Sequence, residues 1–316
     1  MAAPPLRLSP AALRPSIHLA ARWSLSPRVD WPTARRRLEL VQSFPGAPRG
    51  TQIRPVSVGG VAAEELRPPG SGGELRPPGA DDGKLLVYFH GGGYVVGSPR
   101  THRSPVGRMA GAFGGPALSV AYRLAPEHPH PAALDDARAV WRALIGERGL
   151  DPARIVVAGD SAGAGLTLAL ALALRDAGEP LPAALGLISP WLDLTLDMDG
   201  RRPPAPRDVV LSRGLVKAFA AAYLAGASAG QPAVSPLHGE LAGLPPLVVH
   251  TSDQDLIRAD GERLVARARA AGLTVTHEEL PGLWHDPHVN AALMAEPGGS
   301  APLRMAGALR AHVAGI

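Results

Sequence analysis

A serine flanked by glycines lies where a β-rich apolar run gives way to an Ala/Leu-rich helical run. The pentapeptide GDSAG spans Gly159–Gly163, between RIVVA and GLTLALALAL. A nucleophile on a sharp strand-to-helix turn needs small residues two positions before and after it, because the tight backbone brings those positions almost into contact. The pattern predicts Ser161 as a nucleophile at a helix N-terminus, where a developing anion is favoured. The alternative is an N-cap serine between ordinary turn glycines.

A run of glycines after another predicted strand offers backbone donors. HGGG, His90–Gly93, follows LLVYF, and glycines let amides approach a ligand with no Cβ in the way. Acyl transfer passes through an oxyanion that preorganised donors stabilise. The sequence therefore predicts an oxyanion hole made by the amides of Gly91, Gly92 and Ala162. The alternative, a phosphate-binding loop, lacks the Lys-Ser/Thr pair of a Walker A motif and the G-x-G-x-x-G spacing.

A histidine late in the chain could serve as the general base. His285 lies in PGLWHD, just after the predicted strand LTVTHEE, in a loop from which its ring could reach the serine. His288 is a nearby rival, and His277 alternates within the strand, which is typical of a sheet-face residue. A chain order of serine, then acid, then histidine favours His285.

An acid must orient that histidine by accepting a hydrogen bond from Nδ1 and stabilising the imidazolium. The predicted strand PLVVHT is followed by SDQDLIRAD, in which Asp253 and Asp255 are both placed for this role. Asp260 is expected to be exposed on the next helix. The residues alone leave the choice between Asp253 and Asp255 open.

The elements that would position these groups alternate between short β-rich runs and longer helical runs. Continuous apolar strands joined by helix-length connections predict an α/β fold with a mostly parallel central sheet flanked by helices. Predicted strands lie near 52–58, 61–66, 84–90, 116–122, 154–159, 183–189, 246–251 and 273–279. Predicted helices lie near 102–113, 131–148, 162–177, 212–224 and 258–271, with a last one near the C-terminus.

Two segments fall outside this alternation. Residues 1–45 are expected to form short helical pieces, and the segment 191–231 is longer than a usual connection, as lids often are. We expect the two to pack together as a cap on an α/β core of residues 46–190 and 232–316. A duplicated ELRPPG, at 65–70 and 74–79, predicts a turn-rich surface loop.

Composition narrows the class of protein. The 316 residues include no cysteine, which excludes disulfides, thiol nucleophiles and cysteine-ligated zinc. A net charge of +4, spread along the chain, does not favour a nucleic-acid surface. No apolar run is long enough for a bilayer span, and the N-terminus lacks the apolar core of a secretory signal. We therefore expect a soluble, cytoplasmic protein with no metal site.

Three motifs in this order resemble one family. HGGGYVVGS, AYRLAPEHPHPAAL and GDSAG are together similar to the bacterial hormone-sensitive-lipase-like esterases, the GDSAG branch of the α/β-hydrolases, from about Leu85 to His285. The resemblance implies an α/β-hydrolase fold with a helical cap and a serine carboxylesterase acting on short- to medium-chain esters. It implies no cofactor and a small-molecule ester as the partner. A homodimer would be common for such a fold.

The family's D-P-L-x-D-x-G stretch begins with the acid of the catalytic triad. DLIRADG, which starts at Asp255, fits that register, so the resemblance favours Asp255 over Asp253. This chain departs from the family's usual residues at three positions: Leu256 for Pro, His130 for Phe, and Asp286 for Gly. The last follows His285 directly and could alter the electrostatics of the base.

Two other functions are compatible with these residues. An amidase or carbamate hydrolase could use the same triad, because the shape of the pocket selects the leaving group. A non-catalytic small-molecule binder could share the fold, but such binders resembling this family lack the triad histidine, so His285 favours an enzyme.

Some neighbours of the motifs have less specific roles. Asp160 is expected to orient backbone or loop groups and not substrate. Glu127 is expected to be structural, with contact to the active-site loop as the alternative. Tyr94, Trp191 and Leu192 could line an acyl or alcohol pocket, or could belong to the packed core.

Overall fold

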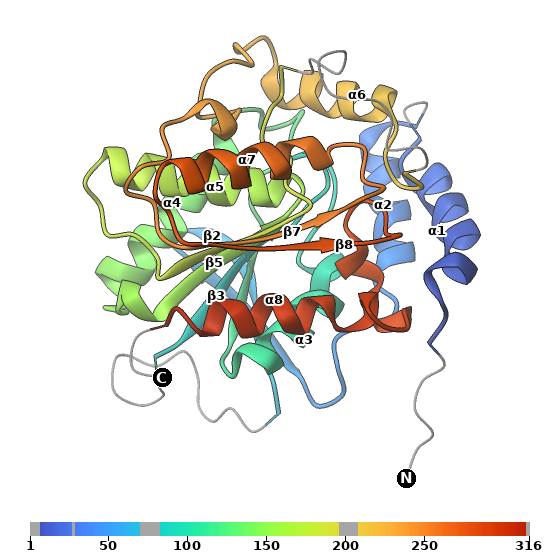
Figure 1. The fold of residues 1–316 in the computed structure, drawn as a ribbon, viewed down its shortest axis with the longest axis horizontal. Helices are drawn as coiled ribbons and strands as arrows, with labels where there is room; N and C mark the ends of the chain where they lie inside the picture. The colour runs from blue at the N-terminus through green and yellow to red at the C-terminus, as the bar shows by residue number, and fades with distance from the viewer. Residues whose placement is uncertain (1–6, 27–28, 70–82, 196–207, 314–316) are drawn as a thin grey trace.

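A single sheet forms the centre of the molecule (Figure 1). The computed structural model describes residues 7–26, 29–69, 83–195 and 208–313. The strands are β1 (Gln52–Val58), β2 (Val61–Arg67), β3 (Leu85–Phe89), β4 (Ala117–Val120), β5 (Ile155–Asp160), β6 (Ala184–Ile188), β7 (Leu247–Ser252) and β8 (Val275–Leu280). All the predicted strands are present, within about two residues of their expected bounds.

The eight strands lie in the order β1-β2-β4-β3-β5-β6-β7-β8. β2 pairs antiparallel with β1 and β4, and all other neighbours are parallel. Every residue of β3 to β7 is buried, as expected for parallel strands covered on both faces. The prediction of a mostly parallel sheet is confirmed.

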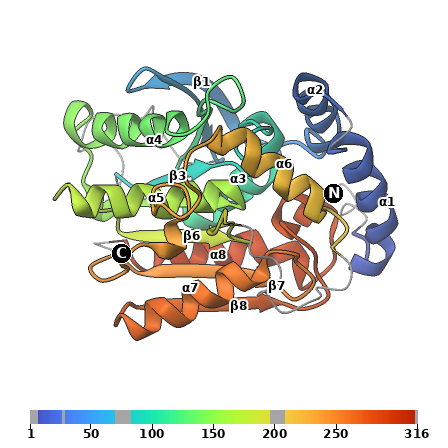
Figure 2. The same ribbon diagram turned by 90° about the horizontal axis from the view of Figure 1, so that it is seen from above.

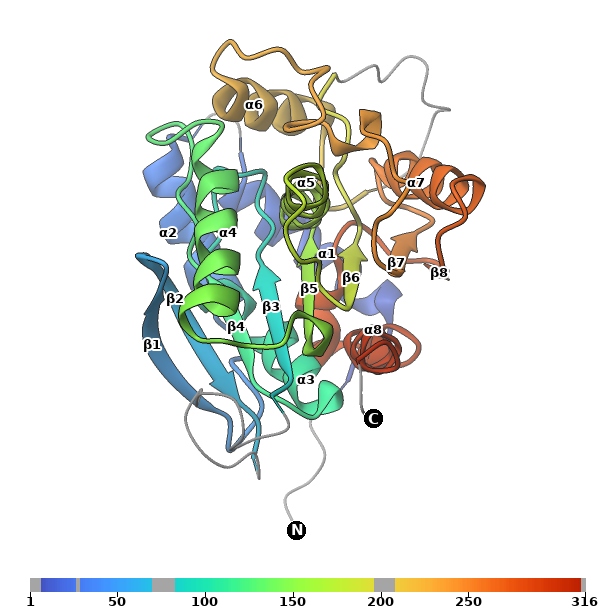
Figure 3. The ribbon, with the colours of Figure 1, turned by 90° about the vertical axis from the view of Figure 1, so that its left-hand side faces the viewer.

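Helices cover both faces of the sheet. They are α1 (Pro10–Ser24), α2 (Trp31–Gln42), α3 (Arg103–Phe113), α4 (Ala132–Arg142), α5 (Ala162–Asp176), α6 (Arg213–Leu224), α7 (Arg258–Ala270) and α8 (Ala301–Arg310). Helices α4, α5 and α7 pack on one face, and α3 and α8 on the other (Figures 1 and 3). This layering is that of an α/β-hydrolase fold.

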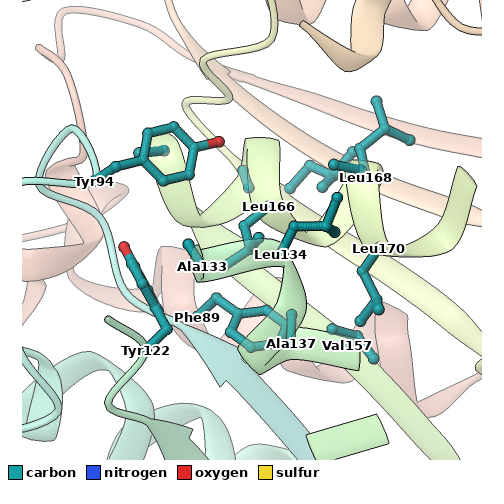
Figure 4. Packing of buried hydrophobic residues seen from close by; sticks show 14 of the residues in the cluster. Phe89, Tyr94, Tyr122, Ala133, Leu134, Ala137, Val157, Leu166, Leu168 and Leu170 are labelled. Atoms are coloured by element: carbon teal, nitrogen blue, oxygen red, sulfur yellow. The ribbon is translucent and has the colours of Figure 1, made fainter. Parts of the chain in front are cut away.

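The main apolar cluster lies between the sheet and helices α4 and α5 (Figure 4). Phe89 and Val157 project from adjacent strands toward Leu134 of α4 and Leu166 of α5. Helix α5 is apolar on nearly all sides, and almost all of it is buried, because neighbouring elements surround it. The helix that follows the candidate nucleophile is therefore held rigidly.

The N-terminal segment is more regular than the short helical pieces expected from sequence. Helix α1 has 15 residues and α2 has 12. Ser9 and Asp30 cap their N-termini by accepting backbone amides, and a proline occupies the first turn of each. Such caps and first-turn prolines favour helix initiation.

Helices α1, α2 and α6 gather beyond the carboxyl ends of the parallel strands (Figures 2 and 3). The rings of Trp31 in α2 and Phe219 in α6 stack with their centroids 5.5 Å apart. His18 of α1 approaches the carbonyl oxygen of Val209 at 3.3 Å. Residues 70–82 and 196–207, which include the second ELRPPG, lie outside the described residues.

The prediction that Asp260 is exposed is wrong. Predicted to be exposed, it is fully buried on the first turn of α7, where Oδ2 accepts hydrogen bonds from the amides of Leu192 at 2.9 Å and Asp193 at 3.1 Å. The chain leaving β6 crosses this turn and covers it. The carboxylate therefore anchors the start of the 191–231 segment.

None of the helices in the described part of the chain combines the length and apolar character needed to cross a bilayer.

Candidate active site

Ser161 occupies a strained turn between β5 and α5. Its φ is +51°, a region that residues other than glycine rarely adopt, and its amide is fixed by a 2.9 Å hydrogen bond to the carbonyl of Ile188 in β6. A Cβ on Gly159 would lie 2.4 Å from backbone atoms of Gly163, and one on Gly163 would lie 2.0 Å from the carbonyl oxygen of Phe89. The backbone contact inferred from the GDSAG spacing is therefore present.

The side chains of Ser161, His285 and Asp255 form one hydrogen-bonded line. His285 Nε2 lies 2.9 Å from Ser161 Oγ, and Nδ1 lies 2.9 Å from Asp255 Oδ2. All three are buried. The other oxygen of Asp255 accepts the amide of Ile257 at 2.9 Å, which fixes the carboxylate. The arrangement lets the ring take a proton from the serine while its far side stays bound to an acid.

The rival residues make different contacts. Asp253 accepts a backbone amide of the loop after β8. His288 and His250 place ring nitrogens 3.0 Å apart, and His277 in β8 lies 2.9 Å from Thr251 Oγ1. The structure thus brings Asp255, and not Asp253, to the histidine.

The HGGG loop lies opposite the serine in a shape that requires glycine. A Cβ on Gly91 would lie 2.2 Å from Asp160 Oδ2, and one on Gly92, whose φ is +111°, would lie 2.2 Å from the carbonyl oxygen of Val96. Both glycines border the same cavity as Ser161. Ala162 is the first residue of α5 and is buried.

The carboxylate of Asp160 packs against the HGGG loop and is itself held by two side chains. Tyr88 donates its hydroxyl to Oδ1 at 2.7 Å, and His102 Nε2 lies 3.1 Å from Oδ2. Burial alone would raise the pKa of Asp160, but His102 and Tyr88 lower it to about 2. Burial likewise works against protonation of His102, yet Asp160 raises the pKa of its imidazole. The site thus contains a fixed, buried carboxylate behind Gly91.

A further carboxylate lies against the histidine. Asp286 Oδ2 is 3.1 Å from His285 Nε2, on the side that faces Ser161. Burial alone lowers the pKa of His285, but the charges of Asp255 and Asp286 outweigh it and raise that pKa well above its ordinary value. Burial and the charge of Asp160 raise the pKa of Asp286 to about 7, against the lowering effect of His285.

A cavity opens on Ser161. Much of its wall is apolar and comes from α1, α2 and the segment around α6, namely Leu25, Leu38, Val210, Leu211, Val216 and Phe219. Trp191 also borders it, as the sequence allowed. Tyr94 and Leu192 are instead packed in the core, with the Tyr94 ring stacked on Tyr223 at 3.8 Å.

Comparison with known proteins assigns the family. Residues 86–289 match the α/β-hydrolase fold family. A solved esterase from the bacterial hormone-sensitive lipase family aligns with a TM-score of 0.85 and 35% identity, covering 96% of this chain and 98% of that one. The chain belongs to the hormone-sensitive-lipase-like esterases. The recognition made from three motifs is confirmed.

Two sequence relatives of this esterase carry names of ester-cleaving enzymes. The acetyl-hydrolase of Streptomyces hygroscopicus is 40% identical over 253 residues, which cover 80% of each protein. The carboxylesterase NlhH of Mycobacterium tuberculosis is 37% identical over 246 residues, 73% of this chain and 74% of that protein.

The esterase holds one further acid that sequence reasoning missed. Asp208, which precedes α6, accepts amides of Val210 and Leu211 with Oδ1 and that of Leu256 with Oδ2 at 2.9 Å. Burial and the charge of Asp255 raise the pKa of Asp208. Nothing local in the sequence marks this residue, because its partner loop lies far along the chain.

Asp208, Asp255 and His285 each place one ligating atom within 4.8 Å of the others, a spacing that a metal ion could use. The amides and the serine that these groups already bind account for the cluster, so we assign no metal ion to it.

Glu127 has a structural role in the esterase, as predicted from the sequence. It accepts two hydrogen bonds from Arg35 of α2, which also donates to the carbonyls of Val95 and Ala125. The guanidinium thereby ties α2 to the loop that follows HGGG.

Proposed function

We propose that this esterase hydrolyses short- to medium-chain carboxylic esters through an acyl-enzyme intermediate on Ser161. The observation that supports this most is the His285 ring, whose two nitrogens each lie 2.9 Å from their partners, Ser161 Oγ and Asp255 Oδ2. A hydroxyl so placed loses its proton to the ring as it attacks a carbonyl carbon.

The first half-reaction forms the acyl-enzyme. Ser161 Oγ bonds to the ester carbonyl carbon while His285 Nε2 takes the hydroxyl proton, and Asp255 stabilises the resulting imidazolium. The amides of Gly91, Gly92 and Ala162 donate to the oxyanion. Nε2 then gives its proton to the alcohol oxygen as the carbon–oxygen bond breaks, and the alcohol leaves.

The second half-reaction returns the serine. Water loses a proton to His285 Nε2 as it attacks the acyl carbon, and the same amides hold the second oxyanion. Collapse of this intermediate breaks the bond to Ser161 Oγ, which regains the proton, and the carboxylic acid leaves.

We further propose that residues 1–45 and 191–231 form the cap of this enzyme. The stacking of Trp31 on Phe219 and the apolar cavity wall supplied by α1, α2 and α6 support that assignment. Because an apolar wall binds acyl chains by burial, a series of p-nitrophenyl esters should show its highest kcat/KM at short or medium chain length. A cytoplasmic location and a homodimer stay predictions from the sequence.

Replacement of the nucleophile tests the mechanism. Ser161→Ala should reduce the turnover of p-nitrophenyl butyrate by at least about a thousand-fold, with no loss of folded structure by circular dichroism. Wild-type turnover by this variant would contradict the assignment. Faster hydrolysis of the matching anilide than of the ester would identify an amidase instead.

The two neighbouring acids provide a matched pair of variants. Asp255→Asn should slow turnover by about a thousand-fold or more, because the amide cannot stabilise the imidazolium. Asp253→Asn changes a carboxylate two residues away, whose Oδ1 accepts the amide of Gly282 at 2.8 Å. A larger loss in Asp253→Asn than in Asp255→Asn would reverse the choice of triad acid.

A further inference from the structure

Asp286 stands where the family usually has glycine, and its backbone is fixed. Its φ of +50° is left-handed, and its amide donates to Ser189 Oγ at 3.2 Å. The side chain borders the cavity that opens on Ser161. Its carboxylate therefore has a defined position in the wall of the site.

The two oxygens of that carboxylate differ. Oδ2 lies 3.1 Å from His285 Nε2. Oδ1 is buried and has no hydrogen-bond partner among the described residues. A buried carboxylate oxygen without a donor is costly, and the molecule that enters the cavity can supply one.

The position of Oδ2 shows which part of an ester would lie nearest. In the proposed mechanism, Nε2 protonates the alcohol oxygen of the ester, so that oxygen must come within hydrogen-bond distance of Nε2. Asp286 approaches the same nitrogen. A hydrogen-bond donor on the second carbon of the alcohol can turn back toward the alcohol oxygen through one staggered torsion about the carbon–carbon bond. Such a donor therefore lies within reach of the Asp286 carboxylate.

The charges that face this point favour a cation. The carboxylates of Asp160 on β5, Asp255 after β7 and Asp208 before α6 surround the pair formed by His285 and Asp286. The positive charges that border the cavity come from the imidazoles of His102 and His285, and no lysine or arginine is among the described residues that line it. A protonated amine would gain a charge-assisted hydrogen bond in such a site.

We propose that Asp286 is a specificity-determining residue that binds a protonated amine on the second carbon of the leaving alcohol, so that the enzyme prefers aminoalkyl esters. The proposal rests on the proposed function, because it places the alcohol beside His285. It goes beyond that function by naming the alcohol side of the substrate.

Two esters of the same shape test it. Dimethylaminoethyl acetate carries a proton on nitrogen at neutral pH, whereas isopentyl acetate has a carbon in the same place. The ratio of their kcat/KM values is measured just above neutral pH, where Asp286, whose pKa is raised to about 7, is mostly ionised. That ratio should be at least about ten-fold larger in the wild type than in Asp286→Asn. Because the same two esters are compared in every variant, the difference in their intrinsic reactivity cancels when the ratios of different variants are compared.

Two more variants complete the experiment. Asp286→Gly suits the left-handed backbone and should lose the preference for the aminoalkyl ester to the same extent as Asp286→Asn. The test therefore does not depend on a single replacement of Asp286. Asp176→Asn removes an exposed carboxylate on α5 and should leave the ratio unchanged.

The outcomes separate this proposal from the proposed function. A ratio equal within about two-fold in the wild type, Asp286→Asn and Asp286→Gly would overturn the role of Asp286. If Ser161→Ala is inactive on both esters in the same assay, the esterase mechanism stands whatever the ratio. If Ser161→Ala cleaves both at wild-type rates, the mechanism falls, and the placement of the alcohol falls with it.

Discussion

The carboxylate of Asp160 fills the space beside Gly91, so that a Cβ on this glycine would lie 2.2 Å from Oδ2. That carboxylate is held by Tyr88 and His102 and cannot move aside without losing both. Gly91→Ala should therefore displace the predicted oxyanion loop and reduce kcat/KM for p-nitrophenyl butyrate by about a hundred-fold or more.

Gly111→Ala is the matched control for this substitution. Gly111 lies in α3, where an added Cβ would meet no atom within 4 Å. This variant should keep wild-type kinetics and a Tm equal to or slightly above that of the wild type, because alanine is a better helix former than glycine. Equal activity of the two alanine variants would contradict the proposed role of the loop.

The pH dependence of activity follows from the charges around His285. The base must be neutral to accept the serine proton, so kcat/KM should rise with pH through an apparent pKa above the ordinary histidine value of about 6.5. Asp286→Asn removes one of the charges that raise the pKa of His285, so the rise should occur at lower pH. The pH dependence of kcat/KM for p-nitrophenyl acetate hydrolysis measures the apparent pKa in the wild type and in Asp286→Asn. Coincident profiles for the wild type and Asp286→Asn would rule out this influence.

Asp260 should matter for stability more than for chemistry. Its buried carboxylate accepts two amides at the start of the 191–231 segment. Asp260→Ala leaves those amides without their acceptor and should lower the free energy of unfolding by about 2 to 3 kcal/mol in urea titration.

Glu262→Ala, on the same helix, provides the comparison. The Glu262 side chain is 47% exposed and pairs with Arg258 at 3.7 Å, so its loss should change stability by less than about 0.5 kcal/mol. Similar unfolding midpoints for the two variants would show that the Asp260 contacts contribute nothing.

Sequence reasoning succeeded where structure is set by neighbours in the chain. The continuous apolar runs predicted β3 to β7, and the glycines around Ser161 predicted a turn whose backbone contacts the structure contains. Asp255 and His285 each follow a strand of the same sheet, so their order along the chain placed them at one edge.

Predictions from the sequence failed where the burial of a residue depends on segments far away in the chain. Asp260 is predicted to be exposed on its helix, but its carboxylate is buried and accepts the amide of Leu192, 68 positions earlier. Asp208 binds the amide of Leu256, 48 positions later. No local pattern records such pairings, since they form only when segments far apart in the chain come together.

Covalent labelling of the intact chain with a fluorophosphonate tests the central claim most directly. Reaction requires a hydroxyl activated by a base, so we predict one adduct by mass spectrometry, on the peptide that contains Ser161. The adduct should be absent in Ser161→Ala and strongly slowed in His285→Ala. Ester turnover by a wild-type protein that acquires no adduct on Ser161, or labelling that is equally fast in His285→Ala, would contradict the account.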